Sequence, residues 1–314
     1  MKRRNAWSRA LICVLLNALI SATALAHENE PPEPHDLWTA WSWEPGVIVG
    51  LALSAWLYFR GSYLMRRRID SPDGRHKWET ASFVVGWVAL FIALISPVHA
   101  LGSALFSAHM LQHEILMVIA APLLVLSRPL MPFLWALPLG WRRRLGTIGK
   151  KSWLYSSWHW LVSPLAAWLL HAAVLWLWHA PPLFQATLKN DLIHTAQHLS
   201  FFISALVFYE ALGFGQTGRE RRMGYGAAVI YVFATAVHTS VLGALLTFSN
   251  MVWYPAYRET TAAWGVTPLE DQQLGGLIMW VPAGVIYIIA GLALLAAWLR
   301  EAEHSMRRRE GRAG

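Results

Sequence analysis

The chain has 314 residues, of which 56% are hydrophobic and only 14% charged, and 19 of them are Trp. A soluble domain is ordinarily about 45–50% apolar and about 25% charged, and Trp concentrates at membrane–water interfaces. This composition argues against a disordered chain, a coiled coil and a disulfide-rich secreted domain. It predicts an all-α integral membrane protein. The net charge of +8 alone would suit nucleic-acid binding, but the positions of the basic residues favour another explanation, given below.

Residues 1–26 have the pattern of a secretory signal peptide. Four basic residues precede a short apolar core over 10–24, and Ala24-Leu25-Ala26 has the small-residue form of a cleavage site. The alternative is an uncleaved first membrane helix. Because the only cysteine, Cys13, lies inside this segment, a cleaved chain would have no disulfide and no thiolate metal ligand.

Residues 27–45 form an acidic segment that cleavage would leave as an extracytoplasmic tail. It holds His27 and His35. A free amine and imidazole at His27, with His35 nearby, could hold Cu(II), although a solvated tail with incidental histidines is the simpler interpretation. The sequence leaves the role of these two residues open.

Seven further apolar stretches predict a seven-span helical bundle that fills 46–299, because each is long enough to cross a bilayer with about 20 residues. We expect the spans at 46–64, 80–98, 106–126, 160–179, 191–212, 225–248 and 274–299. The amphipathic segment 127–159 contains several prolines that interrupt any long helix, so we expect it to lie at the membrane interface.

Basic residues gather on one side of this predicted bundle. The other side has only Lys189 and Arg258 between its spans. The positive-inside rule therefore places the basic loops and the basic tail 300–314 in the cytoplasm, with the mature N-terminus outside. We expect a multi-pass protein of the bacterial cytoplasmic membrane, and the topology explains the net charge without any nucleic-acid partner.

Histidines occupy the outer half of the predicted spans. His109 and His113 in the third span, like His194 and His198 in the fifth, are spaced i, i+4, so each pair places two imidazoles on one helix face. The other histidines of this half are His171 and His179 in the fourth span, His238 in the sixth and His99 at the end of the second.

Polar side chains inside a bilayer are costly and usually mark a functional site, although hydrogen bonds between packed helices are the structural alternative. Neutral imidazole suits copper, zinc, iron and nickel. The sequence therefore predicts a metal or haem site that opens to the outer face. The expected metal ligands are His109, His113, His194, His198, His238, His171 and His179.

Other polar side chains near these histidines are candidates to orient an imidazole, as metal-bound histidines commonly require. They are Gln112, Glu114, Gln197, Asp271 and Gln272. Glu114 could instead relay a proton or pack between helices. Asp271 could cap the last span, or with Gln272 reach the histidines from above. Met110 is a soft thioether of the kind that favours Cu(I).

An ordered set of motifs extends over roughly 45–299. It consists of His109-Met110-Leu111-Gln112-His113, Ala121-Pro122-Leu123-Leu124 with Arg128-Pro129, Trp178-His179-Ala180-Pro181, His194 with His198, His238 with Gly243, Tyr254-Pro255-Ala256-Tyr257, and Asp271-Gln272-Gln273-Leu274-Gly275-Gly276 with Met279-Trp280. Together these motifs resemble the multi-span cytochrome c oxidase assembly factor family, CtaG. The resemblance implies a seven-span protein that is needed to build haem–copper oxidases and that has a role in supplying copper. Its partners would be oxidase subunits or other assembly factors. An unrelated single-span copper-delivery protein shares the family's name, but its cysteine-based site has no counterpart in a mature chain without cysteine.

We therefore expect a non-enzymatic assembly factor for a haem–copper oxidase that binds or delivers copper. The sequence contains no nucleophile elbow, no phosphate loop and no paired catalytic carboxylates. One alternative is a haem-binding membrane oxidoreductase or electron carrier, since histidines on facing helices can supply both axial ligands. A second is a copper transporter, which would need a polar path to the inner side, and a third is a scaffold whose histidines only join helices.

Overall fold

The computed structural model describes residues 31–68, 75–148, 152–213 and 223–313, and this part of the chain is helical without strands. The expected signal peptide and His27 lie outside the described residues. In chain order the α-helices are α2 (Pro45–Arg66), α3 (Arg75–Ile95), α4 (Pro97–Ala104), α5 (Phe106–Glu114), α6 (Ala121–Ser127), α7 (Leu130–Ala136), α8 (Leu139–Ile148), α9 (Ser152–Leu161), α10 (Pro164–His179), α11 (Pro181–Thr187), α12 (Asp191–Leu212), α13 (Tyr225–Thr247) and α14 (Pro268–Ala313). A π-helix η1 (Ile115–Ala120) and the 3₁₀-helices η3 (Pro255–Arg258) and η4 (Thr261–Trp264) complete the set.

Six stretches of helix are long and apolar enough to cross a membrane, which confirms an all-helical, multi-span fold. They are Pro45–Arg66, Lys77–Ile95, Phe106–Ser127, Asp191–Leu212, Tyr225–Thr247 and Pro268–His304. The expected span 160–179 is interrupted, because Trp153–Leu161 meets Pro164–His179 at an angle of 66°. Pro164 lacks an N–H and disfavours helical backbone in the residue before it. Counted as one span, this bent pair brings the total to seven.

The third span changes its helical form halfway. The π-helix η1 separates α5 from α6, and Pro122 follows it within the first turn of α6. Proline cannot donate the hydrogen bond that an α-helix requires at that point, and a π-turn is a common local adjustment often found near functional sites. The histidines of this span lie on α5, before the change.

One expected boundary differs from the structure. The last helix is one element of 46 residues that continues through Pro282 into the basic tail, whereas the sequence predicted a span over 274–299 only. The segment 127–159, expected at the interface, contains the three short helices α7, α8 and α9. Pro129 precedes α7, and Pro138 stands between α7 and α8.

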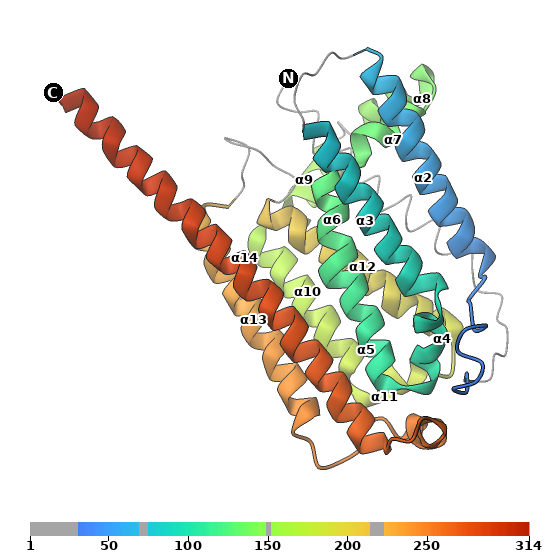
Figure 1. Cartoon of the computed structure of the whole chain (residues 1–314). Helices are drawn as coiled ribbons and strands as arrows, with labels where there is room; N and C mark the ends of the chain where they lie inside the picture. The colour runs from blue at the N-terminus through green and yellow to red at the C-terminus, as the bar shows by residue number, and fades with distance from the viewer. Residues whose placement is uncertain (1–30, 69–74, 149–151, 214–222, 314) are drawn as a thin grey trace.

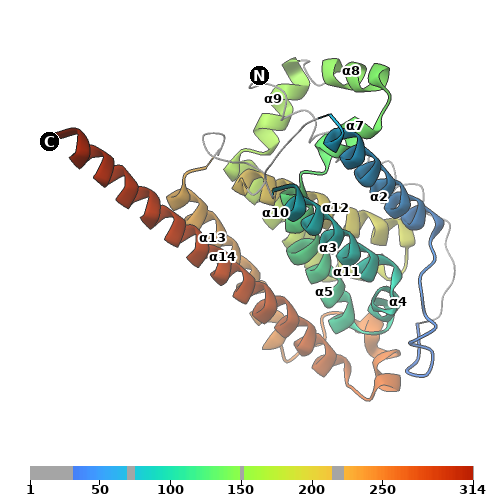
Figure 2. The ribbon, with the colours of Figure 1, turned by 45° about the horizontal axis from the view of Figure 1, so that its top comes forward.

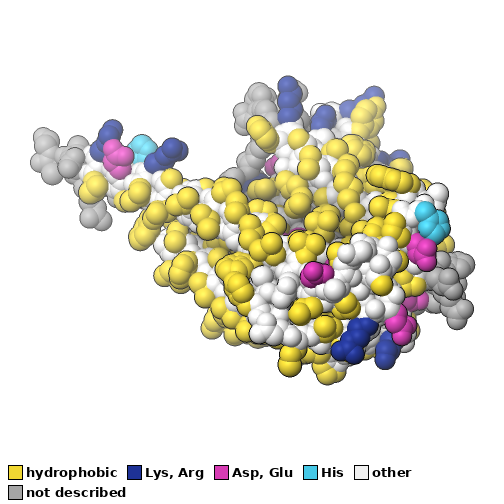
Figure 3. Space-filling view, turned by 60° about the horizontal axis from the view of Figure 1, so that its bottom comes forward, with side chains coloured by type: hydrophobic (Ala, Val, Ile, Leu, Met, Phe, Trp, Pro, Cys, Tyr) yellow, Lys and Arg dark blue, Asp and Glu magenta, His cyan; other side chains and the backbone are white. Residues whose placement is uncertain are grey.

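The bundle has two chemically different ends (Figure 1). One end, which we call the basic end, contains the end of α2, helix α8 and the far end of α14. These elements carry arginines such as Arg66, Arg142 and Arg307. Helices α4 and α11 lie at the opposite end, called the histidine end. Figure 2 shows α13 and α14 side by side along one flank of the bundle. Between the ends, hydrophobic side chains cover much of the visible surface in Figure 3.

Glycines allow α13 and α14 to approach closely. A Cβ atom added at Gly276 would lie 2.7 Å from the carbonyl oxygen of Gly243, and one added at Gly243 would lie 2.8 Å from the carbonyl oxygen of Gly276. Only residues without side chains let two backbones come this near, as in other membrane helix pairs.

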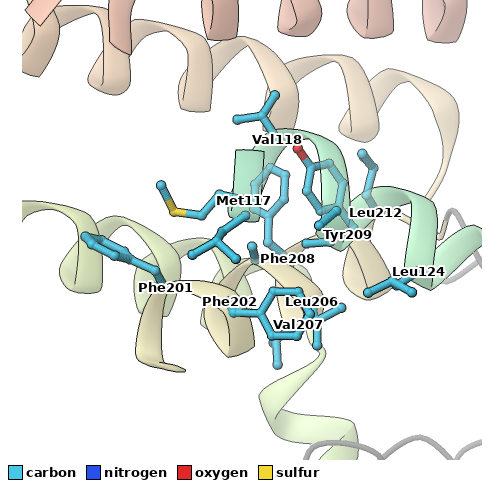
Figure 4. Close-up of a cluster of buried hydrophobic side chains, with 14 of the residues drawn as sticks. Met117, Val118, Leu124, Phe201, Phe202, Leu206, Val207, Phe208, Tyr209 and Leu212 are labelled. Atoms are coloured by element: carbon cyan, nitrogen blue, oxygen red, sulfur yellow. The ribbon is translucent and has the colours of Figure 1, made fainter. Parts of the chain in front are cut away.

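The apolar core lies where α12 meets the third span. Figure 4 shows Met117, Val118 and Leu124 of the third span facing aromatic and aliphatic side chains of α12, from Phe201 to Leu212. Phe201 and Phe208 are completely buried. The histidines of these elements adjoin this closely packed region, since the His113 ring lies 4.5 Å from that of Phe201.

Candidate metal centre

Helices α5 and α12 bring four histidines into one group. His109 and His113 lie one turn apart on α5 with ring centroids 4.5 Å apart, and His194 and His198 of α12 are separated by 4.2 Å. Between the helices, the rings of His109 and His194 lie 5.2 Å apart, as do those of His113 and His198. We call these residues the four-histidine cluster. The spacing i, i+4 predicted each pair, and the packing of two helices unites them.

Free nitrogen atoms converge inside this cluster. One ring nitrogen from each of His109, His194 and His198 lies within 4.8 Å of the others. The Nε2 atoms of His194 and His198 and both ring nitrogens of His113 are buried and have no hydrogen-bond partner in the described part of the chain. Buried polar atoms are normally paired, because an unpaired one costs about 1–3 kcal/mol. A donor set of imidazoles with available lone pairs fits a bound metal ion.

His109 is oriented from both sides. Its Nδ1 lies 3.3 Å from the Gly102 carbonyl oxygen and its Nε2 lies 3.2 Å from Oε1 of Gln197. A neutral imidazole carries only one N–H, so it cannot donate to both oxygens. If Nδ1 donates to Gly102, Nε2 is left with a lone pair, as in a metal-bound histidine, and this atom faces the side-chain amide of Gln197.

Tyr257 supports the same carbonyl group from the loop between α13 and α14. Its hydroxyl donates to the Gly102 oxygen at 2.9 Å and lies 3.3 Å from Nδ1 of His109. Burial raises the pKa of Tyr257 well above its ordinary value, and the Asp271 carboxylate raises it further. The phenol therefore stays protonated and remains a donor. Sequence analysis placed this residue in a motif but gave it no role.

Asp271 holds the start of α5 rather than capping its own helix. Its carboxylate accepts from the backbone N–H groups of Phe106 at 2.6 Å and Ser107 at 3.2 Å, and from the Ser107 hydroxyl at 2.5 Å. The first N–H groups of a helix have no partner within the helix, and here α14 supplies the acceptor. Asp271 thus fixes the helix that carries His109 and His113.

Gln272 supports the adjacent loop. Its Oε1 accepts from the Trp253 N–H at 2.6 Å, and its Nε2 donates to the Met251 carbonyl at 3.0 Å. It is almost fully buried. The sequence left open a direct reach of Asp271 or Gln272 to the histidines. In the structure, both side chains bond to backbone groups instead.

His179 and Met110 form the border of the cluster. Nε2 of His179 lies 3.4 Å from Sδ of Met110, and Nδ1 lies 2.7 Å from the Leu175 carbonyl. Both side chains are buried, and Met110 belongs to the same helix as His109. The pair places a thioether and an imidazole beside the four histidines.

His171 and His238 lie in a different environment. Nδ1 of His171 is 3.1 Å from Oγ of Ser204, and the His238 ring packs edge-on against Trp168 at 5.3 Å. Neither has a ring contact with the four-histidine cluster among the described residues. The structure thus separates them from the other expected ligands.

Glu114 is buried but directed away from this centre. It interacts electrostatically with the phenols of Tyr209 and Tyr287, and its Oε2 has no hydrogen-bond partner among the described residues. It follows His113 directly in the chain, so the next helical position turns it toward another face.

Gln112, which was expected to orient an imidazole, bonds to His99, and His99 and Glu44 are two further residues for which no role was predicted. Gln112 donates from Nε2 to Nδ1 of His99 at 2.7 Å and lies equally far from the Ala93 carbonyl oxygen. The His99 ring stacks on His194 with centroids 5.6 Å apart and planes at 14°. Oε1 of Glu44 lies 3.6 Å from Nε2 of His99. The position of His99 at the outer end of a predicted span could have indicated that it belongs to the site, whereas nothing in the sequence indicated Glu44.

Comparison with known proteins places this geometry in a family. The family model described as cytochrome c oxidase caa3 assembly factor (Caa3_CtaG) matches residues 56–301, a range that contains the whole four-histidine cluster. Uncharacterized proteins of Mycobacterium bovis and Mycobacterium tuberculosis are each 29% identical over 279 residues, which is 87% of this chain and 41% of theirs. One from Mycobacterium leprae is 28% identical over 295 residues, or 90% of this chain and 43% of its own length. The chain thus spans about two fifths of the length of these relatives, and no solved structure matches it.

Proposed function

Because the chain belongs to the cytochrome c oxidase caa3 assembly factor family, we propose that it assists oxidase assembly by holding copper at the four-histidine cluster. The observation that carries this proposal is the convergence of ring nitrogens from His109, His194 and His198. Buried nitrogens of His113, His194 and His198 have no partner among the described residues. His109, His113, His194 and His198 would hold the ion, which is the cargo of the protein. In this proposal the chain binds the ion and hands it over, and it catalyses no reaction.

The chemistry of the donors supports copper. Imidazole binds copper well in either oxidation state, and a thioether favours Cu(I). Met110 lies within contact distance of His179 at the border of the cluster. A soft thioether donor is therefore available beside the four imidazole donors. Zinc, which prefers four-coordinate nitrogen and sulfur sites, is the competitor that metal analysis must distinguish.

The surroundings of the cluster are less suited to haem. Aromatic side chains flank the histidines closely: the Phe201 ring is 4.5 Å from His113, and the Phe184 ring is 5.0 Å from His109. A flat macrocycle would have to separate rings that now contact one another. The same packing bears on transport, because the core that adjoins the cluster at Phe201 and is drawn in Figure 4 is mainly apolar.

The orientation follows from charge. The positive-inside rule would place the basic end in the cytoplasm and the cluster near the outer face of the cytoplasmic membrane. Copper would then be received and released on the outer side, where oxidase subunits or other assembly factors are the partners.

The test is metal analysis with an optical spectrum on detergent-purified protein. We expect about one copper per chain, since one group of nitrogen ligands converges among the described residues, and loss of that copper in the His113→Ala/His198→Ala variant. The control is His304→Ala, which removes an exposed histidine at the basic end and should leave copper unchanged. Circular dichroism and gel filtration would show whether each variant is folded.

Three results would contradict the proposal. A strong Soret band in the purified protein would favour the haem-binding alternative. Equal copper in the wild type and in the cluster variant would move the site elsewhere. A folded wild type that takes up neither Cu(I) nor Cu(II) would leave a scaffold role as the better account.

A further inference from the structure

The side chains of His179 and Met110 face each other at the border of the four-histidine cluster. His179 is the last residue of α10, and its Nδ1 lies 2.7 Å from the Leu175 carbonyl oxygen, one turn back in the same helix. A carbonyl oxygen only accepts, so a neutral His179 ring carries its one proton on Nδ1. Nε2 therefore has a lone pair, and it faces Sδ of Met110 at 3.4 Å. Because a thioether has no proton to donate, this contact is not a hydrogen bond.

Contacts from distant parts of the chain hold these two side chains in place. The Tyr254 hydroxyl donates to the His179 carbonyl at 2.8 Å, which fixes the end of α10. On the other side, Met110 packs against α14 at Gly275, where an added Cβ would lie 3.3 Å from Cγ of Met110. His179 is 2% exposed and Met110 is 0% exposed. The two lone-pair donors are thus kept together in the interior, where a polar atom without a partner is costly.

We propose that Met110 and His179 form a second metal site, specific for Cu(I), beside the four-histidine cluster. This inference rests on the proposed function for the identity of the metal. Metal bonds are about 2.0 Å long to imidazole nitrogen and about 2.3 Å to sulfur, so donors up to about 4.3 Å apart can share one ion. The 3.4 Å between Nε2 and Sδ lies within that limit. An ion there gives the Nε2 lone pair the partner that a thioether cannot be.

Donor type and charge both favour the monovalent ion. Thioether sulfur is a soft donor that selects Cu(I), and neither donor carries a charge that would offset that of an ion. Met110 belongs to a buried apolar cluster that includes Phe106, Phe184 and Tyr254. The cost of burying an ion rises with the square of its charge, so a divalent ion costs about four times as much here as Cu(I). The pair therefore discriminates against Cu(II) and Zn(II), both of which four imidazoles accept.

The two sites adjoin but fill under different conditions. Met110 directly follows His109 on α5, and the rings of His179 and His113 both pack on Phe201, at 5.9 Å and 4.5 Å. Air oxidises Cu(I) to a divalent ion, which the pair disfavours. The one copper per chain expected of protein purified in air therefore belongs to the four-histidine cluster. The second site fills when Cu(I) is supplied without oxygen.

The experiment counts bound Cu(I) and looks for its sulfur ligand. Detergent-purified protein freed of metal is loaded anaerobically with Cu(I) buffered by bicinchoninate and desalted, and its copper is measured. We expect about two Cu(I) per chain, one at each site, and a sulfur neighbour in X-ray absorption at the copper edge. Met110→Leu should lose one Cu(I) and the sulfur signal, and it should bind Cu(II) like the wild type. A core swap of similar volume is usually tolerated, so this variant should fold.

Two further variants make the test decisive. Met117→Leu is the matched control, because it makes the same change at another buried methionine of the third span, one that packs in the apolar core. It should keep both Cu(I) ions and the sulfur signal. The His113→Ala/His198→Ala variant should keep one Cu(I), with sulfur as its neighbour.

The possible results separate the two sites. Equal Cu(I) content in the wild type and Met110→Leu, or a wild type without the sulfur signal, would overturn the second site and leave copper at the four-histidine cluster. Loss of all Cu(I) in folded His113→Ala/His198→Ala would also overturn it, because the pair would then hold no ion by itself. The proposed function would fail instead if that variant kept as much copper as the wild type while Met110→Leu lost its Cu(I). A wild type that takes up no copper would refute both.

Discussion

Replacing Asp271 should destabilise the protein through a helix to which it does not belong. Its carboxylate accepts three hydrogen bonds from Phe106 and Ser107 at the start of α5, and it is 2% exposed. In Asp271→Ala, two buried backbone N–H groups lose their acceptor, at about 1–3 kcal/mol each. The Ser107 hydroxyl can rotate to another acceptor. We expect a loss of about 3–5 kcal/mol in the free energy of unfolding, a large share of the stability of an ordinary domain.

Asp271→Asn tests the charge separately from the shape. The amide keeps one oxygen acceptor but loses the negative charge, which is favourable at a helix N-terminus. Hydrogen bonds to charged groups contribute about 1.5–3 kcal/mol, so a loss near that range is expected. The assay is unfolding in a denaturing-detergent titration, followed by circular dichroism.

Glu270→Gln is the matched control, because it makes the same chemical change at the neighbouring, exposed residue. Glu270 accepts from the Thr267 N–H at 2.8 Å, and glutamine retains that acceptor. We expect little or no change in the free energy of unfolding, as for other exposed charges. The reasoning would be refuted if Asp271→Ala unfolded like the wild type, or if Glu270→Gln were equally harmful.

The remaining predictions concern the helix pair, the buried phenol and the extent of the site. Gly276→Val should disrupt the packing of α13 on α14, because even a Cβ would lie 2.7 Å from the Gly243 oxygen, whereas Gly284→Val on the same helix meets nothing within 4 Å; thermal unfolding of both variants in detergent checks this. The pKa of Tyr257 is raised in the folded state, so this phenol contributes stability that is fully present below its ordinary pKa of about 10. That contribution is lost at higher pH. Above that pH, Tyr257→Phe should show a shallower loss of stability than the wild type, by up to about 1.4 kcal/mol per pH unit, and parallel profiles would contradict this. His238→Ala should keep its full copper content in metal analysis, because this residue lies apart from the four-histidine cluster, and a loss of copper in folded protein would enlarge the site.

Local patterns in the sequence were sufficient for the spans and for each histidine pair. Helical spacing determines which residues share a face, so His109 with His113 and His194 with His198 follow from spacing alone. Both pairs were also expected at the same depth. Depth does not give the direction in which a residue faces around the bundle, and for that reason His238 was grouped with residues that it does not contact.

The supporting contacts could not be predicted, because they join distant parts of the chain. Asp271 is 165 positions from Phe106, and Tyr257 is 155 positions from Gly102. Capping rules relate a residue to the helix that follows it, so they favoured α14 as the helix that Asp271 caps. Only the packing of α14 against α5 shows that Asp271 accepts from the first N–H groups of α5, which begins at Phe106.

These long-range contacts explain why the histidine end is built as it is. An imidazole cluster without bound metal contains unpaired polar atoms, which are costly in a dry interior, so other contacts must hold the helices that carry it. Asp271 fixes the start of α5, Tyr257 fixes Gly102 against His109, and Gln112 fixes His99. None of these three bonds uses one of the buried nitrogens that lack a partner among the described residues. The framework can therefore remain in place whether the cluster is loaded or empty, as a protein that receives an ion and later gives it up requires.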